Sequence, residues 1–269
     1  MSSRFAATWL EQRERADHAA RARALLPALA DWLPERPLTI ADLGAGSGSN
    51  LRYLGPRLAP AQHWVLIDQD SGLLDTAASP APRITLAPRA GDLAAAALPA
   101  DLAPDLVTAS ALLDLVSEPW LEALASRCRE RRSAVLLALS VDGEIGAEPA
   151  DAADPAVFAL VQAHQRRDKG FGPALGGVAA RTAETVFRAA GYRTWLSPSP
   201  WRLGPDAGAL QASLVDGWAQ AAREQAGPDA GAWLDDWHRR RYSAIRSGAG
   251  RLRVGHQDLL ALPPGDAGG

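Results

Sequence analysis

Residues 38–50, Leu-Thr-Ile-Ala-Asp-Leu-Gly-Ala-Gly-Ser-Gly-Ser-Asn, join a run of aliphatic and β-branched residues directly to three glycines at alternate positions. The run at residues 38–43 predicts a buried strand, and the glycines predict a sharp turn that opens a helix. Glycine lets the backbone approach a ligand closely, where a Cβ would collide. The helix that follows supplies unpaired N–H groups and a partial positive charge. The stretch therefore predicts a nucleotide-type site at the carboxyl end of the first strand.

The spacing of the glycines separates two classes of ligand. The dinucleotide fingerprint is G-x-G-x-x-G/A, and its third small residue would fall on Ser49, whereas the third glycine here is Gly48. An acid, Asp42, also precedes the turn. A carboxylate suits the ammonium group of an amino-acid-like cofactor, whereas it would repel a pyrophosphate. A glycine turn between a strand and a helix need bind nothing, so the rest of the chain must supply the context.

The composition of the chain limits the classes of protein to which it could belong. The chain has 269 residues, enough for one large domain or for a domain with an insertion. A net charge of −3 and a pI of about 6.0 give no overall electrostatic footprint for nucleic acid. We expect a cytoplasmic protein without a membrane partner, because the chain has neither an apolar run of about 20 residues nor the layout of a signal peptide. The single cysteine, Cys128, excludes an intrachain disulfide and a thiolate cluster, so we expect no metal.

Short apolar runs predict four more strands, and they alternate with helical segments. That alternation predicts a doubly wound parallel sheet, which binds its ligands at the carboxyl ends of the strands. Asp68 ends the second strand, where a carboxylate can accept from the two hydroxyls of a ribose. Asp92 and Ser110 follow the third and fourth strands in the same register. The predicted strands are residues 63–68, 83–87, 105–110 and 133–142.

In the form acidic-x-G-x-G-x-G, the turn after Asp42 resembles the first motif of class I S-adenosylmethionine-dependent methyltransferases. Asp68, Gly91-Asp92 and Asp105-Leu-Val resemble their later motifs, so the resemblance extends over residues 38–143. It implies a Rossmann-like, doubly wound, seven-stranded and mostly parallel sheet with an antiparallel last strand, and S-adenosyl-L-methionine as cofactor. It also implies that Asp92 accepts from the adenine amino group. The residues that the resemblance assigns to the cofactor are Asp42, Gly44, Ala45, Gly46, Gly48, Asn50, Asp68, Gln69, Gly91, Asp92, Leu93, Ser110 and Ala111.

Ahead of the first strand, residues 5–33 carry alanine, leucine and tryptophan at helical spacing, which predicts two helices. In this kind of fold such helices commonly cover the cofactor, so we expect residues 1–35 to form a helical lid. Arg13 lies four residues from Trp9 and from Asp17, on one helix face. Either this face is a solvated stripe anchored by Trp9, or Arg13 binds the carboxylate of the cofactor.

Two segments carry candidate chemistry of their own. Asp114 stands where many relatives have an aromatic residue or a histidine, so it is either a buried cap or a catalytic group. A helix at residues 155–168 leads into a glycine-rich loop that should pass over the cleft. There His164 could accept a proton from a nucleophile, and nearby cations could hold an anionic group. The alternative is a solvated charge run that caps a helix. These cations are Arg166, Arg167 and Lys169.

The last third of the chain departs from the family pattern. A helical stretch at residues 210–247 separates an edge strand at residues 192–201 from a last strand at residues 250–262. It could build the substrate pocket or a homodimer contact. The expected organisation is a lid at residues 1–35, a methyltransferase α/β domain at residues 36–262 and a flexible tail at residues 263–269. The expected helical insertions are at about residues 150–180 and 205–248.

Our lead interpretation is an enzyme that methylates oxygen or nitrogen on a small, polar or anionic molecule. No Asn-Pro-Pro-Tyr sequence follows the fourth strand, which disfavours a nucleic-acid amine as target. A non-catalytic binding protein with the methyltransferase fold is one alternative. An RNA methyltransferase is another, and it requires one basic face from residues 238–241 and 166–169. The least favoured is an NAD(P)-dependent oxidoreductase, given Ser49, Asp42 and the absence of a Tyr-x-x-x-Lys pair.

Overall fold

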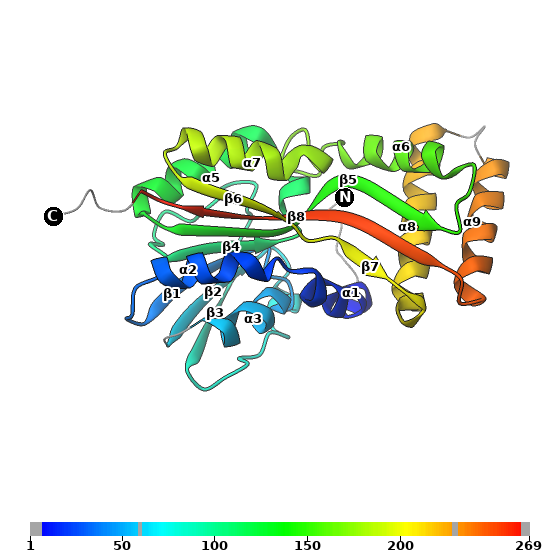
Figure 1. Ribbon diagram of the computed structural model, residues 1–269. Coiled ribbons are helices and arrows are strands. Elements are labelled where there is room, and N and C mark those ends of the chain that lie inside the picture. Colours follow the sequence, from blue (N-terminus) through cyan, green and yellow to red (C-terminus); the bar gives the residue numbers. More distant parts are fainter. Residues whose placement is uncertain (1–6, 59–60, 228–230, 265–269) are drawn as a thin grey trace.

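A mixed eight-stranded sheet runs through the computed structural model, which describes residues 7–58, 61–227 and 231–264 (Figure 1). The strand order is β3-β2-β1-β4-β5-β8-β6, and β7 pairs with β8. Strands β1 to β5 pair in parallel, whereas β8 is antiparallel to β5, β6 and β7. The strand order reverses beside β1, which is where such sheets form a ligand crevice. The strands are β1 (Leu38–Leu43), β2 (Gln62–Asp68), β3 (Ile84–Ala90), β4 (Leu106–Ser110), β5 (Ala134–Glu148), β6 (Arg193–Pro198), β7 (Trp201–Leu203) and β8 (Arg251–Leu262).

Helices cover both faces of this sheet. In Figure 1, α5 and α7 lie above the strands, α2 and α3 lie below them, and α1 lies below the middle of β8. The helices α8 and α9 stand at the end of the sheet where β5 and β8 project furthest. The helices are α1 (Ala7–Ala20), α2 (Leu26–Trp32), α3 (Ser49–Leu54), α4 (Ser71–Leu74), α5 (Glu118–Arg131), α6 (Asp154–Gln165), α7 (Ala179–Ala189), α8 (Gly208–Ala226) and α9 (Gly231–Arg246).

The central strands are apolar on both sides because both sides are covered. On β1, Ala41 and Leu43 pack into the cluster that includes α5 and α7. Leu38 and Ile40 point to the opposite face and pack with side chains of α2 and α3. The continuous apolar run that predicts the first strand is therefore a consequence of two cores, one on each side of the sheet.

A third core lies beyond the parallel part of the sheet. There β5 and β8 pair with each other over Ile145–Glu148, after an irregularity that follows Val141. The helices α6 and α8 pack together on this extension, and α9 packs on α8. Trp218 and Trp237 are buried in this cluster. The two predicted helical insertions thus join into one apolar layer beside the carboxyl ends of the central strands.

The predicted fold class is confirmed, with changes in detail. The expected strand at residues 192–201 is two strands, because Pro200 has no N–H to continue the ladder and Ser199 donates its own to the carbonyl of His256. The expected helical stretch at residues 210–247 is two helices. Residues 1–6 of the expected lid and 265–269 of the expected tail lie outside the described residues. Within the described ranges, no helix combines the length and apolar composition needed to cross a membrane.

Candidate functional site

The glycine turn follows β1 in the form that its sequence predicts. Gly44, Gly46 and Gly48 have φ angles of +66°, +52° and +82°, which residues with a Cβ rarely adopt. The N–H groups of Gly44 and Ala45 donate to the carbonyl of Ile67 at 2.8 and 3.0 Å. The turn is therefore pinned to the end of β2, and each of the three glycines is required by its backbone conformation.

Beneath the turn lies a buried carboxylate with one oxygen unpartnered. Asp42 is 0% exposed, and its Oδ1 accepts from Nδ2 of Asn50 at 2.9 Å. Among the described residues, Oδ2 has no hydrogen-bond partner. Burial raises the pKa of Asp42 to about 7, although Asn50 and the positive charge of Arg21 oppose the increase. Arg21 donates to Oδ1 of Asn50 at 2.7 Å, so a buried polar chain supports the carboxylate from one side only.

The other predicted cofactor residues gather at the same edge of the sheet. Asp68 accepts from the N–H of Gly46 at 2.8 Å and from that of Asp70 at 2.9 Å. Asp92 is exposed after β3 and accepts from the N–H of Ala94 at 2.8 Å. Gln69 is exposed, whereas Gly91, Ser110 and Ala111 are half-buried and Leu93 is buried. Ala111 has a φ of +54°, a strained conformation of the kind found at functional sites.

The first helix lies directly over the glycine turn. A Cβ on Gly46 would lie 3.7 Å from Cδ1 of Leu10. Arg13 binds both oxygens of Asp17, at 2.9 and 3.2 Å, and its guanidinium lies 5.1 Å from the ring of Trp201. Asp17 also accepts from Nε1 of Trp201 at 3.0 Å. Burial raises the pKa of Asp17, although its ion pair with Arg13 opposes the increase. Arg13 is therefore held by Asp17 and Trp201, on the helix that covers the turn.

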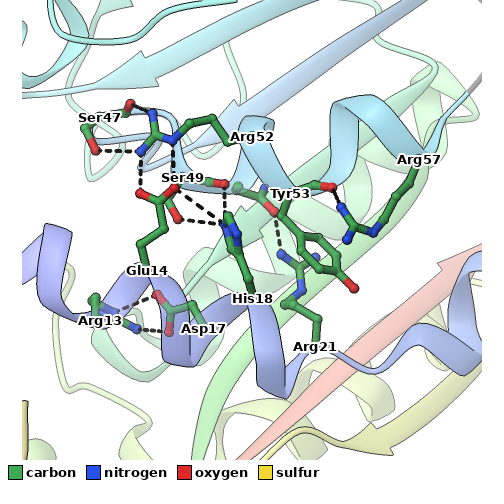
Figure 2. A network of polar contacts seen from close by, with 11 residues as sticks. Arg13, Glu14, Asp17, His18, Arg21, Ser47, Ser49, Arg52, Tyr53 and Arg57 are labelled. Carbon is green, nitrogen blue, oxygen red and sulfur yellow. Dashed lines mark hydrogen bonds and ion pairs between the residues drawn. The ribbon is translucent and has the colours of Figure 1, made fainter. Parts of the chain in front are cut away.

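Polar contacts fasten this helix to the turn, as Figure 2 shows. Glu14 accepts from Nε and Nη2 of Arg52 at 2.7 and 2.5 Å, and Arg52 also donates to the carbonyl of Ser47 at 2.6 Å. The hydrogen bond from Arg52 holds the pKa of Glu14 below its usual value. His18 lies 3.0 Å from the carbonyl of Ser49. We call Glu14, His18 and Arg52 the latch.

A second carboxylate, Asp114, lies in the 3-10 turn Leu113–Leu115 that follows β4. Oδ1 of Asp114 is sealed from solvent and has no hydrogen-bond partner among the described residues. Burial raises the pKa of Asp114, and the positive charges of Arg13 and Lys169 oppose the increase. Lys169 is half-buried, whereas its loop neighbours Arg166 and Arg167 are exposed. The positive charges of Arg13 and Lys169 are thus both close enough to act on Asp114.

The remaining predicted side chains lie elsewhere. His164 contacts Oε2 of Glu224 on α8 at 2.9 Å, and Arg167 reaches the same oxygen at 3.5 Å. Arg166 packs near Gly176. The structure does not bring these three to Asp114. His256 is a buried side chain that was not among the predicted residues. It is 3% exposed on β8, and the nearby charge of Arg13 helps to lower the pKa of His256. No local signal could have found it, because only strand pairing brings it there.

Two further observations limit where the candidate site can lie. A cavity of about 610 Å³ lies between residues 94–100, the start of α5 and Phe171, and it contains none of the predicted site residues. In the described part of the chain, no group of three His, Cys, Asp or Glu side chains could hold a metal ion. We therefore centre the candidate site on the glycine turn.

No protein-family model matches this chain, and no curated protein sequence does so either. Solved structures share its fold. A presumed methyltransferase of Bacillus halodurans aligns with a TM-score of 0.50 at 14% identity, over 90% of this chain and 98% of that one. Phosphoethanolamine N-methyltransferase 2 of Haemonchus contortus gives 0.48 at 13% identity, over 98% of this chain and 59% of that one. A cyclopropane synthase of Mycobacterium tuberculosis gives 0.47 at 12% identity, over 93% and 94%. At these identities the likeness shows the fold alone.

Proposed function

We propose that this chain is an S-adenosylmethionine-dependent methyltransferase that methylates oxygen or nitrogen on a small, polar or anionic molecule. The observation that carries the proposal is the unpartnered Oδ2 of Asp42 beneath the glycine turn. A buried carboxylate with a free acceptor oxygen fits an ammonium group, which S-adenosylmethionine carries. It does not fit the pyrophosphate of a dinucleotide, because two negative charges would meet in a medium of low dielectric constant.

The described residues fit the other parts of that cofactor. Asp68 is half-buried at the end of β2. Within the described residues each of its oxygens accepts only one hydrogen bond, so a ribose diol can still donate to it. Asp92 is exposed and able to accept from an adenine amino group. Nη1 of Arg13 makes no hydrogen bond within the described residues and suits the carboxylate of the cofactor. These assignments support the proposal residue by residue.

Methyl transfer requires the protein mainly to align the two reacting molecules. The cofactor supplies an activated methyl group, and its transfer is an in-line displacement, so nucleophile and donor must be held in one line. Asp114 and Lys169 are close enough for their charges to interact, and they suit a polar or anionic acceptor. We propose Asp114 as the side chain most suited to hold a proton of the acceptor. His164, with Glu224 as its partner, is the weaker candidate.

The alternatives differ in what they require. An RNA methyltransferase needs a free basic face, but Arg239, Arg240 and Arg241 pair with Asp236, Asp151 and Asp154. That pairing disfavours RNA as the target. A binding protein without catalysis would keep the cofactor site and show no turnover.

Calorimetry with S-adenosylhomocysteine and NAD in parallel tests the proposal. We expect S-adenosylhomocysteine to bind and NAD to give no heat. Asp68→Ala should weaken S-adenosylhomocysteine by about tenfold or more, since a hydrogen bond to a charged group contributes about 1.5–3 kcal/mol. Asp75 is an exposed carboxylate directly after α4, and Asp75→Ala is the matched control. Binding of NAD alone would overturn the proposal, and normal affinity in Asp68→Ala would overturn the ribose assignment.

A further inference from the structure

His256 lies on β8, beyond the carboxyl ends of the strands that carry the proposed cofactor residues. It pairs with Val141 on β5, at the point where β5 leaves the parallel part of the sheet. This point is past the carboxyl end of β4, whose last residue, Ser110, pairs with Ala138. The ring of His256 packs against Trp201, with 5.0 Å between the ring centroids. The proposed cofactor residues follow β1 to β4, so His256 stands beyond them along the same edge.

The tautomer of His256 follows from its one hydrogen bond. Nδ1 lies 3.0 Å from the carbonyl oxygen of Val254. Because a carbonyl only accepts, Nδ1 carries the hydrogen and Nε2 keeps a lone pair. Within the described residues Nε2 makes no hydrogen bond, and it is not one of the unpartnered atoms that the protein seals from solvent. The ring therefore offers one acceptor atom to whatever enters beside it.

The surroundings of His256 keep that atom an acceptor. The guanidinium of Arg13 packs on the same Trp201 ring, at 5.1 Å, and Asp17 fixes both Arg13 and Trp201. Burial, and then the positive charge of Arg13, lower the pKa of His256 to about 3. The ring is therefore neutral at neutral pH. A neutral acceptor nitrogen beside a fixed cation favours one kind of ligand group. That group donates a hydrogen bond and is itself uncharged.

We propose that Nε2 of His256 accepts a hydrogen bond from the N–H or O–H group of the methyl acceptor and so orients its lone pair toward the methyl carbon. The proposal rests on the proposed function and adds the acceptor class, a neutral amine or alcohol that still bears a hydrogen. That lone pair forms the new bond while the carbon–sulfur bond breaks and leaves its electron pair on sulfur. The hydrogen then leaves as a proton to the carboxylate of Asp114, the side chain proposed above to hold it, because Arg13 disfavours a second cation at His256.

The test uses the wild-type protein saturated with S-adenosylhomocysteine and the ¹⁵N spectrum of its histidine rings. The probes are aniline and phenol, both neutral at pH 7, and their controls are N,N-dimethylaniline and anisole, which have no hydrogen to donate. We expect Nε2 of His256 to be unprotonated, and its signal to shift with aniline or phenol and not with the methylated controls. A protonated Nε2, or a signal that neither donor shifts, would overturn the proposal.

A variant gives an independent measure. His256→Phe keeps a ring against Trp201 but removes the acceptor atom, so aniline or phenol should bind about tenfold more weakly, as expected for one lost hydrogen bond. The affinity for S-adenosylhomocysteine should stay unchanged. If S-adenosylhomocysteine fails to bind the wild type, the proposed function fails; if it binds and Nε2 stays unengaged, only the role of His256 fails. Should His256→Phe not fold, the wild-type spectrum decides.

Discussion

The charge of Asp42 is unfavourable to folding and, in the proposed site, favourable to binding. Its pKa is raised from 3.8 to about 7 by burial, so between these pH values the folded state holds the proton more tightly and stability falls as the pH rises. Asp42→Asn removes that charge, and we expect the free energy of unfolding at pH 8 to increase by about 2 kcal/mol. Urea denaturation at pH 8 and at pH 3 measures it, and the gain should almost vanish at pH 3, where the carboxyl is mostly protonated in both states.

The same variant should weaken S-adenosylhomocysteine by at least about tenfold, since a charged hydrogen bond is lost. Asp75→Asn makes the same chemical change on an exposed residue and should alter neither stability nor binding. A variant that lost stability at pH 8, or bound as well as the wild type, would refute the assignment of Asp42.

The pH dependence of cofactor affinity follows from the same residue. An ammonium group at Oδ2 favours the charged carboxylate, so binding lowers the pKa of Asp42 below its free value of about 7. The affinity for S-adenosylhomocysteine should therefore be level between about pH 7 and 8, and should fall by up to about tenfold for each unit below pH 7. Calorimetry across this range tests the slope, with Asp42→Asn as the control that should show none. A slope that persists in Asp42→Asn would place the titrating group elsewhere.

The residues that sequence could predict are those whose contacts lie within one short segment of the chain. Asp42 and the three glycines belong to one short segment, and the strand and turn that they form fix their geometry. The contacts that bring Arg21 to Asn50 and His256 to Trp201 join residues distant in sequence. Arg21 pairs with Asp258 and donates to Asn50, and no pattern in their own segments indicates either contact. Sequence could therefore indicate the residues of the proposed cofactor site, but not the contacts of Arg21 and His256.

Among the elements, α1 is the one whose attachment we expect to control access to the turn. Glu14→Gln keeps the size of the side chain but removes the charge that holds Arg52 at 2.5 and 2.7 Å. We expect α1 to open more often, so that S-adenosylhomocysteine dissociates several-fold faster, as expected for loss of about 1 kcal/mol from a half-buried pair. Stopped-flow dissociation measures this rate, and hydrogen exchange of residues 7–20 reports the opening.

Glu11→Gln is the matched control for the latch. It changes the same charge on the same helix, but Glu11 is exposed and outside the latch. Its dissociation rate should equal that of the wild type. Equal rates for Glu14→Gln and the wild type would mean that α1 does not limit exit of the ligand.

Element boundaries were predictable where one physical signal dominates. The apolar runs of β1 and β2 gave strands within one residue of those observed. Strand β5 continues to Glu148, well beyond the predicted end at residue 142, because its pairing with β8 and not its own apolarity sustains it. The helices α8 and α9 could be recognised as helical, but their packing with α6 depends on side chains far apart in sequence.

At the scale of the whole molecule, Asp258 joins three parts of the chain. It accepts from the N–H groups of Ala22 and Leu139 at 2.9 and 2.8 Å and from Oγ of Ser199 at 2.6 Å. Nε of Arg21 lies 3.4 Å away. Asp258→Ala leaves a buried cation unpaired, so we expect a loss of about 3–5 kcal/mol in the free energy of unfolding. Urea denaturation measures it.

Asp236→Ala is the control for that loss. It breaks an exposed ion pair with Arg239 and should cost less than about 1 kcal/mol. Similar losses of unfolding free energy in the two variants would show that the buried contacts of Asp258 stabilise the fold no more than an exposed ion pair does.

The single thiol makes global unfolding measurable and links it to the proposed cofactor. Cys128 is 0% exposed on α5, and burial raises the pKa of its thiol, so a thiol reagent can reach it only after the core opens. We expect labelling in water to be slow, at a rate set by the population of opened protein. S-adenosylhomocysteine at about 100 times its Kd should slow it by about a hundredfold, since ligand binding adds about 2.7 kcal/mol to the native state. NAD at the same concentration should have no effect. Fast labelling without denaturant would contradict the buried position of Cys128, whereas slow labelling that S-adenosylhomocysteine leaves unchanged would keep the fold and refute the cofactor.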